Sequence, residues 1–262
     1  MVATEGGIAL LEHARSILGH LERASDELAH IAPRQGGTVR VGVTPWLMQS
    51  VMPRVITAFR ELRPAVQLDI FDSHGKEYPM VRNGQVDFEF GPRPQDPFSH
   101  GLEIRQIYSY SFAVVCRADH PSIGARSLVQ LRGYDWVLSH PIDRVSISLH
   151  KLIEAQAADG VCRVHYVRSV LGALAIVRDS DMLTMFPWPL VETPDVRGRC
   201  VALHLDEIVH ESTTCLIKRR CEPLQGPALV FYEAFRKIAR ESLQSSDSTT
   251  RRIFSMVDRV AE

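Results

Sequence analysis

One stretch of the chain, residues 36–75, limits the possible folds more than any other part of the sequence. Residues 39–43 carry valine at every second position between turn-forming residues, which predicts a strand. Apolar residues recur at helical spacing over residues 51–62, and Pro64 ends this helix because the residue before a proline is pushed out of the helical region. Residues 66–70 resume the alternation of a strand. A strand, a helix and a second strand with short connections form a βαβ unit, so we predict an α/β fold with a parallel sheet.

Polar and aromatic residues follow both strands of this unit. Thr44, Pro45 and Trp46 come after the first strand, and Ser73 and His74 come after the second. In an open parallel sheet, ligands bind beyond the carboxyl ends of the strands, so we expect a binding site here. Two alternatives stay open: the Thr44 hydroxyl can simply cap the next helix, and Trp46 can belong to the core.

The same stretch resembles the opening of the effector-binding domain of LysR-type transcriptional regulators. The resemblance is carried by residues 37–45, by Pro53, by Phe59-Arg60 and by residues 63–66. Two later segments are similar to the same family. These are Asn83-Gly84 with the acidic strand up to Gly91-Pro92, and Asp119-His120-Pro121.

The resemblance extends to about residue 243 and implies a fold that is α/β and type 2 periplasmic-binding-protein-like. Two Rossmann-like lobes would be joined by two crossover strands and preceded by a long linker helix. The expected domains are residues 1–34 as a linker and dimerisation helix, residues 37–115 plus 217–243 as effector-binding lobe I, residues 116–216 as effector-binding lobe II, and residues 244–262 as a C-terminal tail.

The predicted helix over residues 5–31 has an apolar stripe at heptad spacing and charged residues on the opposite face. Such a stripe packs either on its own domain or against a second subunit, and its place before the first strand favours the second choice. The family's linker helix is similar. The expected dimerisation positions, for a homodimer or homotetramer, are Leu11, Ala14, Leu18, Leu21 and Leu28.

The overall composition fits an ordinary soluble globular protein, with 45% apolar and 23% charged residues. The formal net charge of −1 argues against this chain being a strong nucleic-acid binder. Neither a membrane span nor a signal peptide is expected, which indicates a cytoplasmic protein without a membrane partner. In the resembled family a DNA-binding head precedes the linker helix. Only residues 1–3 precede it here, so DNA binding is expected only of a longer parent protein.

No motif in the sequence indicates catalysis, a cofactor or a metal site. The nucleophile elbow, the phosphate loop, the zinc-protease helix and the dinucleotide fingerprint are all missing. Ser139 and His140 are adjacent in the sequence, but adjacency does not indicate a catalytic triad. His210-Glu211 lacks the second histidine of a zinc helix. The five cysteines are scattered, and we expect free buried thiols. We therefore predict no enzyme.

Further polar and apolar residues at predicted element ends complete the expected effector site. Arg93 follows the third strand of lobe I and could pair with an acid, although a surface ion pair is its alternative role. In lobe II, Ser139 and Phe186-Pro187 end strands, and Ser169 precedes a helix. Capping is the alternative for Ser169, and core packing is the alternative for Phe186. The expected effector-binding residues are Thr44, Pro45, Trp46, Ser73, Arg93, Ser139, Ser169, Phe186 and Pro187.

The residues and the resemblance together predict the effector-sensing domain of a LysR-type regulator. It would bind a small anionic, aromatic molecule between two lobes. A solute-binding protein of the same fold, serving a transporter, is the main alternative, and an enzyme on this scaffold is the second.

Two predictions concern elements outside the site. Two separate strands are predicted at residues 101–104 and 111–116. The polar stretch at residues 245–250 predicts a flexible joint, and the apolar residues from 253 to 260 predict a frayed or loosely docked tail helix.

Overall fold

The chain forms two compact units in a computed structural model. The structure describes residues 37–73, 75–94, 96–139, 147–207 and 210–259, and the isolated positions 4, 6, 7, 10, 14, 17, 18 and 21. The first unit contains the residues up to Tyr108 together with Thr213–Gln244, and the second contains Ser109–Ser212 and Ser245–Arg259. These boundaries lie up to seven residues from those expected, because they fall inside two long strands.

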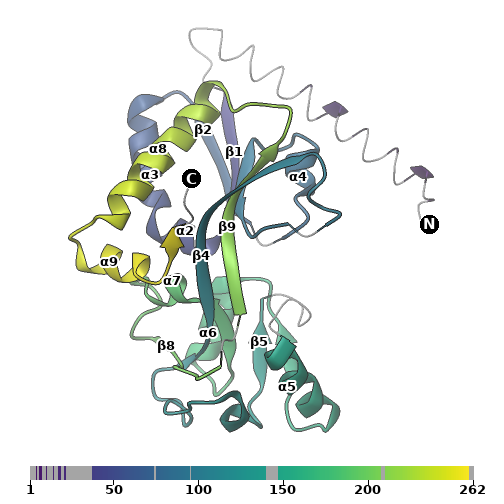
Figure 1. The fold of residues 1–262 in the computed structure, drawn as a ribbon, viewed down its shortest axis with the longest axis vertical. Helices are drawn as coiled ribbons and strands as arrows, with labels where there is room; N and C mark the ends of the chain where they lie inside the picture. Colours follow the sequence, from purple (N-terminus) through teal and green to yellow (C-terminus); the bar gives the residue numbers. More distant parts are fainter. Residues whose placement is uncertain are drawn as a thin grey trace. The chain divides into compact units, whose positions relative to one another are not determined.

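The first unit is built on the predicted βαβ unit. Strand β1 (Thr38–Val43) pairs in parallel with β2 (Gln67–Asp72) on one side (Figure 1). On its other side β1 pairs in parallel with β3 (Phe88–Gly91). Strand β9 (His210–Arg219) adds to β3 in the antiparallel direction. The carboxyl ends of β2, β1 and β3 therefore meet at one edge of this sheet.

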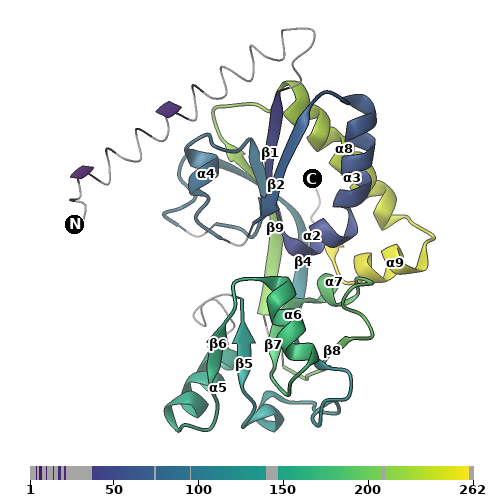
Figure 2. The same cartoon turned by 180° about the vertical axis from the view of Figure 1, so that it is seen from behind.

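Helices cover one face of this sheet. Helices α2 (Pro45–Ser50) and α3 (Met52–Leu62) connect β1 to β2, and α8 (Gly226–Leu243) packs beside α3 (Figure 2). Because side chains alternate along a strand, the valines of β1 and the phenylalanines of β3 face these helices. The buried aromatic residues of this core are Phe59, Phe88, Phe90, Phe231 and Phe235.

A smaller core lies in the same unit around α4 (Pro79–Arg82). It contains Tyr78 and Val81, which pack with buried residues of β4 (Leu102–Arg117) and β9 such as Leu102 and Ile217. The β1 position Gly42 and the β3 position Glu89 are side by side in the sheet register. They alternate with the residues that face α3 and α8.

The second unit has its own sheet pairings and core. The later part of β4 pairs antiparallel with β7 (Thr184–Pro187) and β8 (Cys200–Ala202), while β5 (Trp136–Leu138) pairs in parallel with β6 (Val164–Tyr166). Trp136, Leu149 and Leu183 are fully buried in this core. The helices are η1 (Leu128–Leu131), α5 (Ile147–Ala158), α6 (Val170–Arg178) and α7 (Trp188–Val191).

Strand β4 corrects one prediction. The two strands expected at residues 101–104 and 111–116 are a single strand of 16 residues. The residues between them mix polar side chains with Ile107, Tyr108 and Tyr110. Residues 105–107, 109 and 111 are half-buried, however, and keep the extended backbone because β4 is paired in the sheet.

The C-terminal segment corrects a second prediction. Ser248–Phe254 form helix α9, which begins at the capping residue Asp247, so residues 248–250 are not a flexible joint. Ile253 and Phe254 are 3% and 6% exposed, and α9 packs against α7 in the second unit. Two further residues then form the short strand β10 (Asp258–Arg259), which pairs with β4. The tail is docked, not frayed, because its apolar residues are buried.

The expected linker helix lies almost entirely outside the described residues, and so do Leu11 and Leu28. Ala14, Leu18 and Leu21 are described and exposed, Leu18 by 59% and Leu21 by 62%. Their role in dimerisation stays a prediction. Among the helices that the structure describes, none is both long and apolar enough to cross a membrane.

Candidate functional site

Three neighbouring strands of the first unit end at the same edge, and their last backbone bonds place the predicted polar residues there. The Thr44 N–H donates to the carbonyl of Phe90 at 2.9 Å, and the Ser73 N–H donates to the carbonyl of Val43 at 2.9 Å. Thr44, Ser73 and Gly91 thus stand at the ends of β1, β2 and β3. The structure brings together the two predicted hydroxyl residues of this unit.

The Thr44 hydroxyl is buried without a hydrogen-bond partner among the described residues. Thr44 is 5% exposed and precedes α2, yet its side chain makes no capping bond. N-capping, the alternative considered for this residue, is therefore excluded in this structure. An unpaired buried hydroxyl costs about 1 to 3 kcal/mol, so this group is available to a ligand.

The Ser73 hydroxyl is paired with a buried carboxyl group. Ser73 Oγ donates to Glu89 Oε2 at 2.6 Å, and the two residues are 3% and 5% exposed. Burial raises the pKa of the Glu89 carboxyl, and the hydrogen bond from Ser73 acts in the opposite direction. Within the described residues, the edge of the sheet thus combines the unpaired Thr44 hydroxyl, the bonded Ser73 hydroxyl and the Glu89 carboxyl group.

Glycines make room for this acid and its neighbours. A Cβ at Gly42 would lie 2.6 Å from Glu89 Cγ, and a Cβ at Gly91 would lie 2.9 Å from Ser73 Oγ. Tyr78, with a positive φ of 52°, directs its hydroxyl to the carbonyl of Pro92 just after β3. The loop after β3 is therefore fixed against the residue that precedes α4.

Glu89, Gly42 and Tyr78 also lie at this edge of the candidate site, and the sequence did not predict them. One signal was present: a glutamate stands between Phe88 and Phe90 in a strand with both faces buried. Its position opposite Gly42 depends on the register of β1 and β3, which are far apart in the sequence.

Trp46, expected beside the ligand, lies in the core of the first unit. Its side chain is fully buried, its Nε1 donates to Thr214 Oγ1 at 3.1 Å, and its ring meets Tyr108 edge-on at 5.5 Å. Pro45 is the first residue of α2. The core alternative for Trp46 thus has direct support, and its contact with a ligand stays a prediction.

Arg93 and Ser139 lie near element ends as expected. Arg93 follows β3 and is exposed. Burial raises the pKa of the Cys215 thiol, and the charge of Arg93 opposes this shift without reversing it. Ser139 follows β5 in the second unit and is half-buried. Their roles in effector binding stay predictions.

The remaining predicted residues belong to the second unit. The Ser169 hydroxyl is exposed and accepts a hydrogen bond from the Gly172 N–H at 3.2 Å, so Ser169 caps α6. Phe186 is 1% exposed, and Pro187 ends β7. Capping and core packing, the alternatives for Ser169 and Phe186, are both observed. A site that joins residues of both units stays a prediction.

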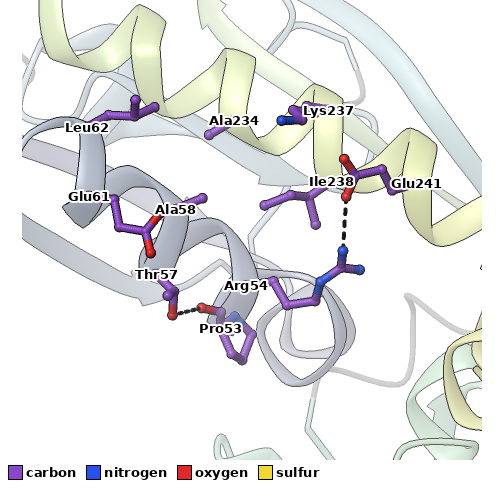
Figure 3. A pocket seen from close by; sticks show the side chains of 10 residues that line it. All are labelled: Pro53, Arg54, Thr57, Ala58, Glu61, Leu62, Ala234, Lys237, Ile238 and Glu241. Atoms are coloured by element: carbon purple, nitrogen blue, oxygen red, sulfur yellow. Dashed lines mark hydrogen bonds and ion pairs between the residues drawn. The ribbon is translucent and has the colours of Figure 1, made fainter.

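A groove of about 550 Å³ runs between α3 and α8 (Figure 3). Arg54 of α3 and Glu241 of α8 form an ion pair of 3.0 Å across it, and both side chains are about half exposed. Thr57 donates to the carbonyl of Pro53 within α3. The groove contains none of the predicted effector residues, and it lies on the outer side of the helices that cover the sheet.

The described residues offer no metal site and no disulfide. They contain no group of three or more side chains that could hold a metal ion. Four of the five cysteines are buried and all are free, as expected from their scattered positions. Burial raises the pKa of the Cys116 thiol to about 11, so this thiol is unreactive at neutral pH.

A sequence profile decides the family. The profile described as the LysR substrate binding domain matches residues 33–240. The chain belongs to this family. The match includes the three strand ends of the first unit and most of the second unit, and it ends within α8, before α9 and β10.

Curated relatives of this LysR domain are transcriptional regulators. The regulator GbpR of Azospirillum brasilense is 27% identical over 202 residues, which is 74% of this chain and 58% of the relative. TdcA of Escherichia coli K12 is 21% identical over 188 residues, 70% of this chain and 59% of the relative. The chain thus spans about three fifths of the length of the relatives it matches.

Solved LysR structures have the same fold. CbnR complexed with its target DNA has a TM-score of 0.58 at 20% identity, covering 92% of this chain and 85% of that chain. The effector-binding domain of BenM with its effector benzoate has a TM-score of 0.54 at 18% identity, covering 80% and 96%. That of QuiR in complex with shikimate has a TM-score of 0.56 at 15% identity, covering 79% and 99%.

The prediction of a LysR effector-binding domain with a periplasmic-binding-protein-like fold is therefore confirmed. The chemical nature of the effector does not follow from the family.

Proposed function

We propose that this chain is the sensor of a LysR-type transcription regulator and that it binds a small organic acid at the carboxyl ends of β1 and β2. The observation that carries this proposal is the Thr44 hydroxyl, which is buried at the end of β1 with no partner among the described residues. At the end of a strand, where ligands bind in a parallel sheet, a bound ligand can supply the missing bond and offset this cost.

An acid suits this hydroxyl because a carboxylate offers only acceptors and a threonine hydroxyl can donate. Benzoate and shikimate, bound by BenM and QuiR, are both carboxylates, and we propose the same class here. Trp46 and Phe186 were expected to flank an aromatic ring. Both are at most 1% exposed, so the proposal concerns the acid group alone.

The wider proposal follows the family. Ser73 lines the site beside Thr44, and Arg93, Ser139, Ser169 and Pro187 contribute when the effector is bound. A DNA-binding domain outside this chain reads the operator, since CbnR binds its target DNA. The parent regulator acts in the cytoplasm as a homodimer or homotetramer. Effector binding favours one of two pre-existing arrangements.

The test is the variant Thr44→Val, which removes the hydroxyl and keeps the shape. A thermal-shift screen of small acids, benzoate and shikimate among them, is run on the natural chain and on the variant. We expect at least one acid to raise the melting temperature of the natural chain. Without ligand, Thr44→Val should unfold at the same or a higher temperature, because no hydrogen bond is lost. The acid should raise the melting temperature of Thr44→Val by less than it raises that of the natural chain.

Thr184→Val is the matched control. The Thr184 hydroxyl is also buried without a partner among the described residues, but it lies at the start of β7. This variant should keep the full response to the acid. An acid that stabilises Thr44→Val as strongly as the natural chain contradicts the role of Thr44, and a complete acid screen without a response contradicts the acid class.

A further inference from the structure

The Ser73 hydroxyl, the second hydroxyl at the sheet edge, already uses its one proton in a hydrogen bond. A serine hydroxyl carries one hydrogen, and Ser73 Oγ donates it to Glu89 Oε2 at 2.6 Å. The remaining lone pairs of Ser73 Oγ can only accept. While Glu89 is ionised, Ser73 cannot donate to an effector.

The carboxyl group of Glu89 is held in place for this bond. Its side chain lies over Gly42, where any larger residue would displace it, since a Cβ there would be 2.8 Å from Oε2. Among the residues that the structure describes, the Ser73 hydroxyl is the one hydrogen-bond partner of the Glu89 side chain, and no cation pairs with it. Among these described residues, the hydrogen bond from Ser73 is therefore the interaction that stabilises the Glu89 charge.

Thr44 and Ser73 therefore differ in what they offer. The Thr44 hydroxyl has no partner in the part of the chain that the structure describes, and it can donate to an acid. Ser73, one strand away at the same edge, presents only acceptor capacity. A carboxylate placed against Ser73 would put two acceptors in contact, whereas a hydroxyl or ammonium group would form a bond.

We propose that the Ser73–Glu89 pair selects effectors that carry a hydrogen-bond donor, a hydroxyl or an ammonium group, in addition to the acid group that Thr44 binds. This inference rests on the proposed function and narrows the ligand to hydroxy acids and amino acids. Glu89 is a positioning residue, because it acts through the proton of Ser73.

The first test compares acids in matched pairs with and without the donor. The probes are 3-hydroxybenzoate and benzoate, glycerate and propionate, and shikimate and 1-cyclohexenecarboxylate. For any pair that binds, we expect the donor-bearing acid to bind the natural chain about tenfold more tightly, the worth of one hydrogen bond. Equal affinity of the two members overturns the proposal.

The variant Glu89→Gln separates selection from simple packing. The amide can donate to Ser73 Oγ and free the serine proton to donate outward, so the preference for the donor-bearing acid should disappear or reverse. Glu61→Gln, an exposed carboxyl on α3, is the control and should keep the preference. An unchanged preference in Glu89→Gln overturns the proposal, because a merely structural glutamate has this result.

A second test needs no ligand. The chain is labelled with ¹³C at the glutamate side chains, and the Glu89 resonance is identified by its loss in Glu89→Gln. We expect Glu89 to be ionised at pH 7, and we expect its pKa to rise in Ser73→Ala. A protonated Glu89 at pH 7, or an unchanged pKa in Ser73→Ala, overturns the inference. If no acid binds, the proposed acid class fails, while this titration still decides whether Ser73 donates to Glu89.

Discussion

Gly42 and Glu89 are two residues on neighbouring strands that occupy one space. Because a Cβ at position 42 would lie 2.6 Å from Glu89 Cγ, the variant Gly42→Ala must push the carboxyl group away from Ser73. We expect a loss of about 1 to 3 kcal/mol in the free energy of unfolding, measured by urea titration.

The double variant Gly42→Ala/Glu89→Ala gives the sharper result, because the shortened side chain leaves room for the new methyl group. Its loss should be at least about 1 kcal/mol smaller than the sum of the two single losses. Gly124→Ala, where the added methyl meets nothing within 4 Å, is the control and should change little. Additive losses would show that the two positions do not compete.

The acidity of Glu89 also predicts a dependence of stability on pH. Burial raises its pKa in the folded chain above the ordinary value of 4.5. The neutral form therefore stabilises the fold fully below pH 4.5, and this contribution is lost as the pH rises through the folded pKa. A pKa difference of one between the folded and the unfolded chain corresponds to about 1.4 kcal/mol in the free energy of unfolding.

We therefore expect Glu89→Gln to gain stability relative to the natural chain between pH 4 and pH 7.5, as measured by urea unfolding at several pH values. In Ser73→Ala the free energy of unfolding should fall more over this pH range than in the natural chain. The hydrogen bond that lowers the Glu89 pKa is removed in this variant. A constant difference between Glu89→Gln and the natural chain at all pH values would contradict the raised pKa.

Among the elements, helix α9 packs on the second unit and should contribute to its stability, which the sequence did not predict. Phe254 is 6% exposed, α9 packs on α7, and Arg252 Nε lies 3.6 Å from Glu192 Oε2. Phe254→Ala should cost about 3 kcal/mol, since it leaves a cavity in the second unit. Hydrogen exchange at α7 should accelerate in this variant. Arg251→Ala, an exposed change on the same helix, should leave exchange at α7 unaltered; equal effects of both would indicate a loosely attached tail.

Elements with local patterns were predictable, and those defined by distant partners were not. The βαβ unit was predicted because valine alternation, helical spacing and Pro64 all act within a few residues. The middle of β4 and the docking of α9 depend on pairing and burial far along the chain. The same holds for the site. Thr44 and Ser73 follow from strand ends, whereas Glu89 requires the register of β1 with β3.

At the scale of the whole molecule, the two units are connected by long strands. Residues of β4 and β9 belong to both units, and the chain enters the second unit again after Gln244. The sequence predicted two lobes with two strand crossings, but it placed the boundaries at the ends of these strands. The boundary between the two units falls inside each strand, because each strand pairs with different partners along its length.

The remaining prediction at this scale concerns assembly through the N-terminal segment. Leu18 and Leu21 are 59% and 62% exposed, and they belong to a heptad stripe that we expect to pair with a second copy. Deletion of residues 1–34 should lower the mass measured by light scattering, and Leu18→Glu/Leu21→Glu should do the same, because two charges cannot be buried in a helix seam. Val129→Glu, at a position that is 70% exposed in the second unit, is the control and should keep the natural mass. A mass that stays the same in the deletion and in the double variant would show that the stripe does not pair, and the coupling of effector binding to the DNA-binding domains would then have to pass through another surface.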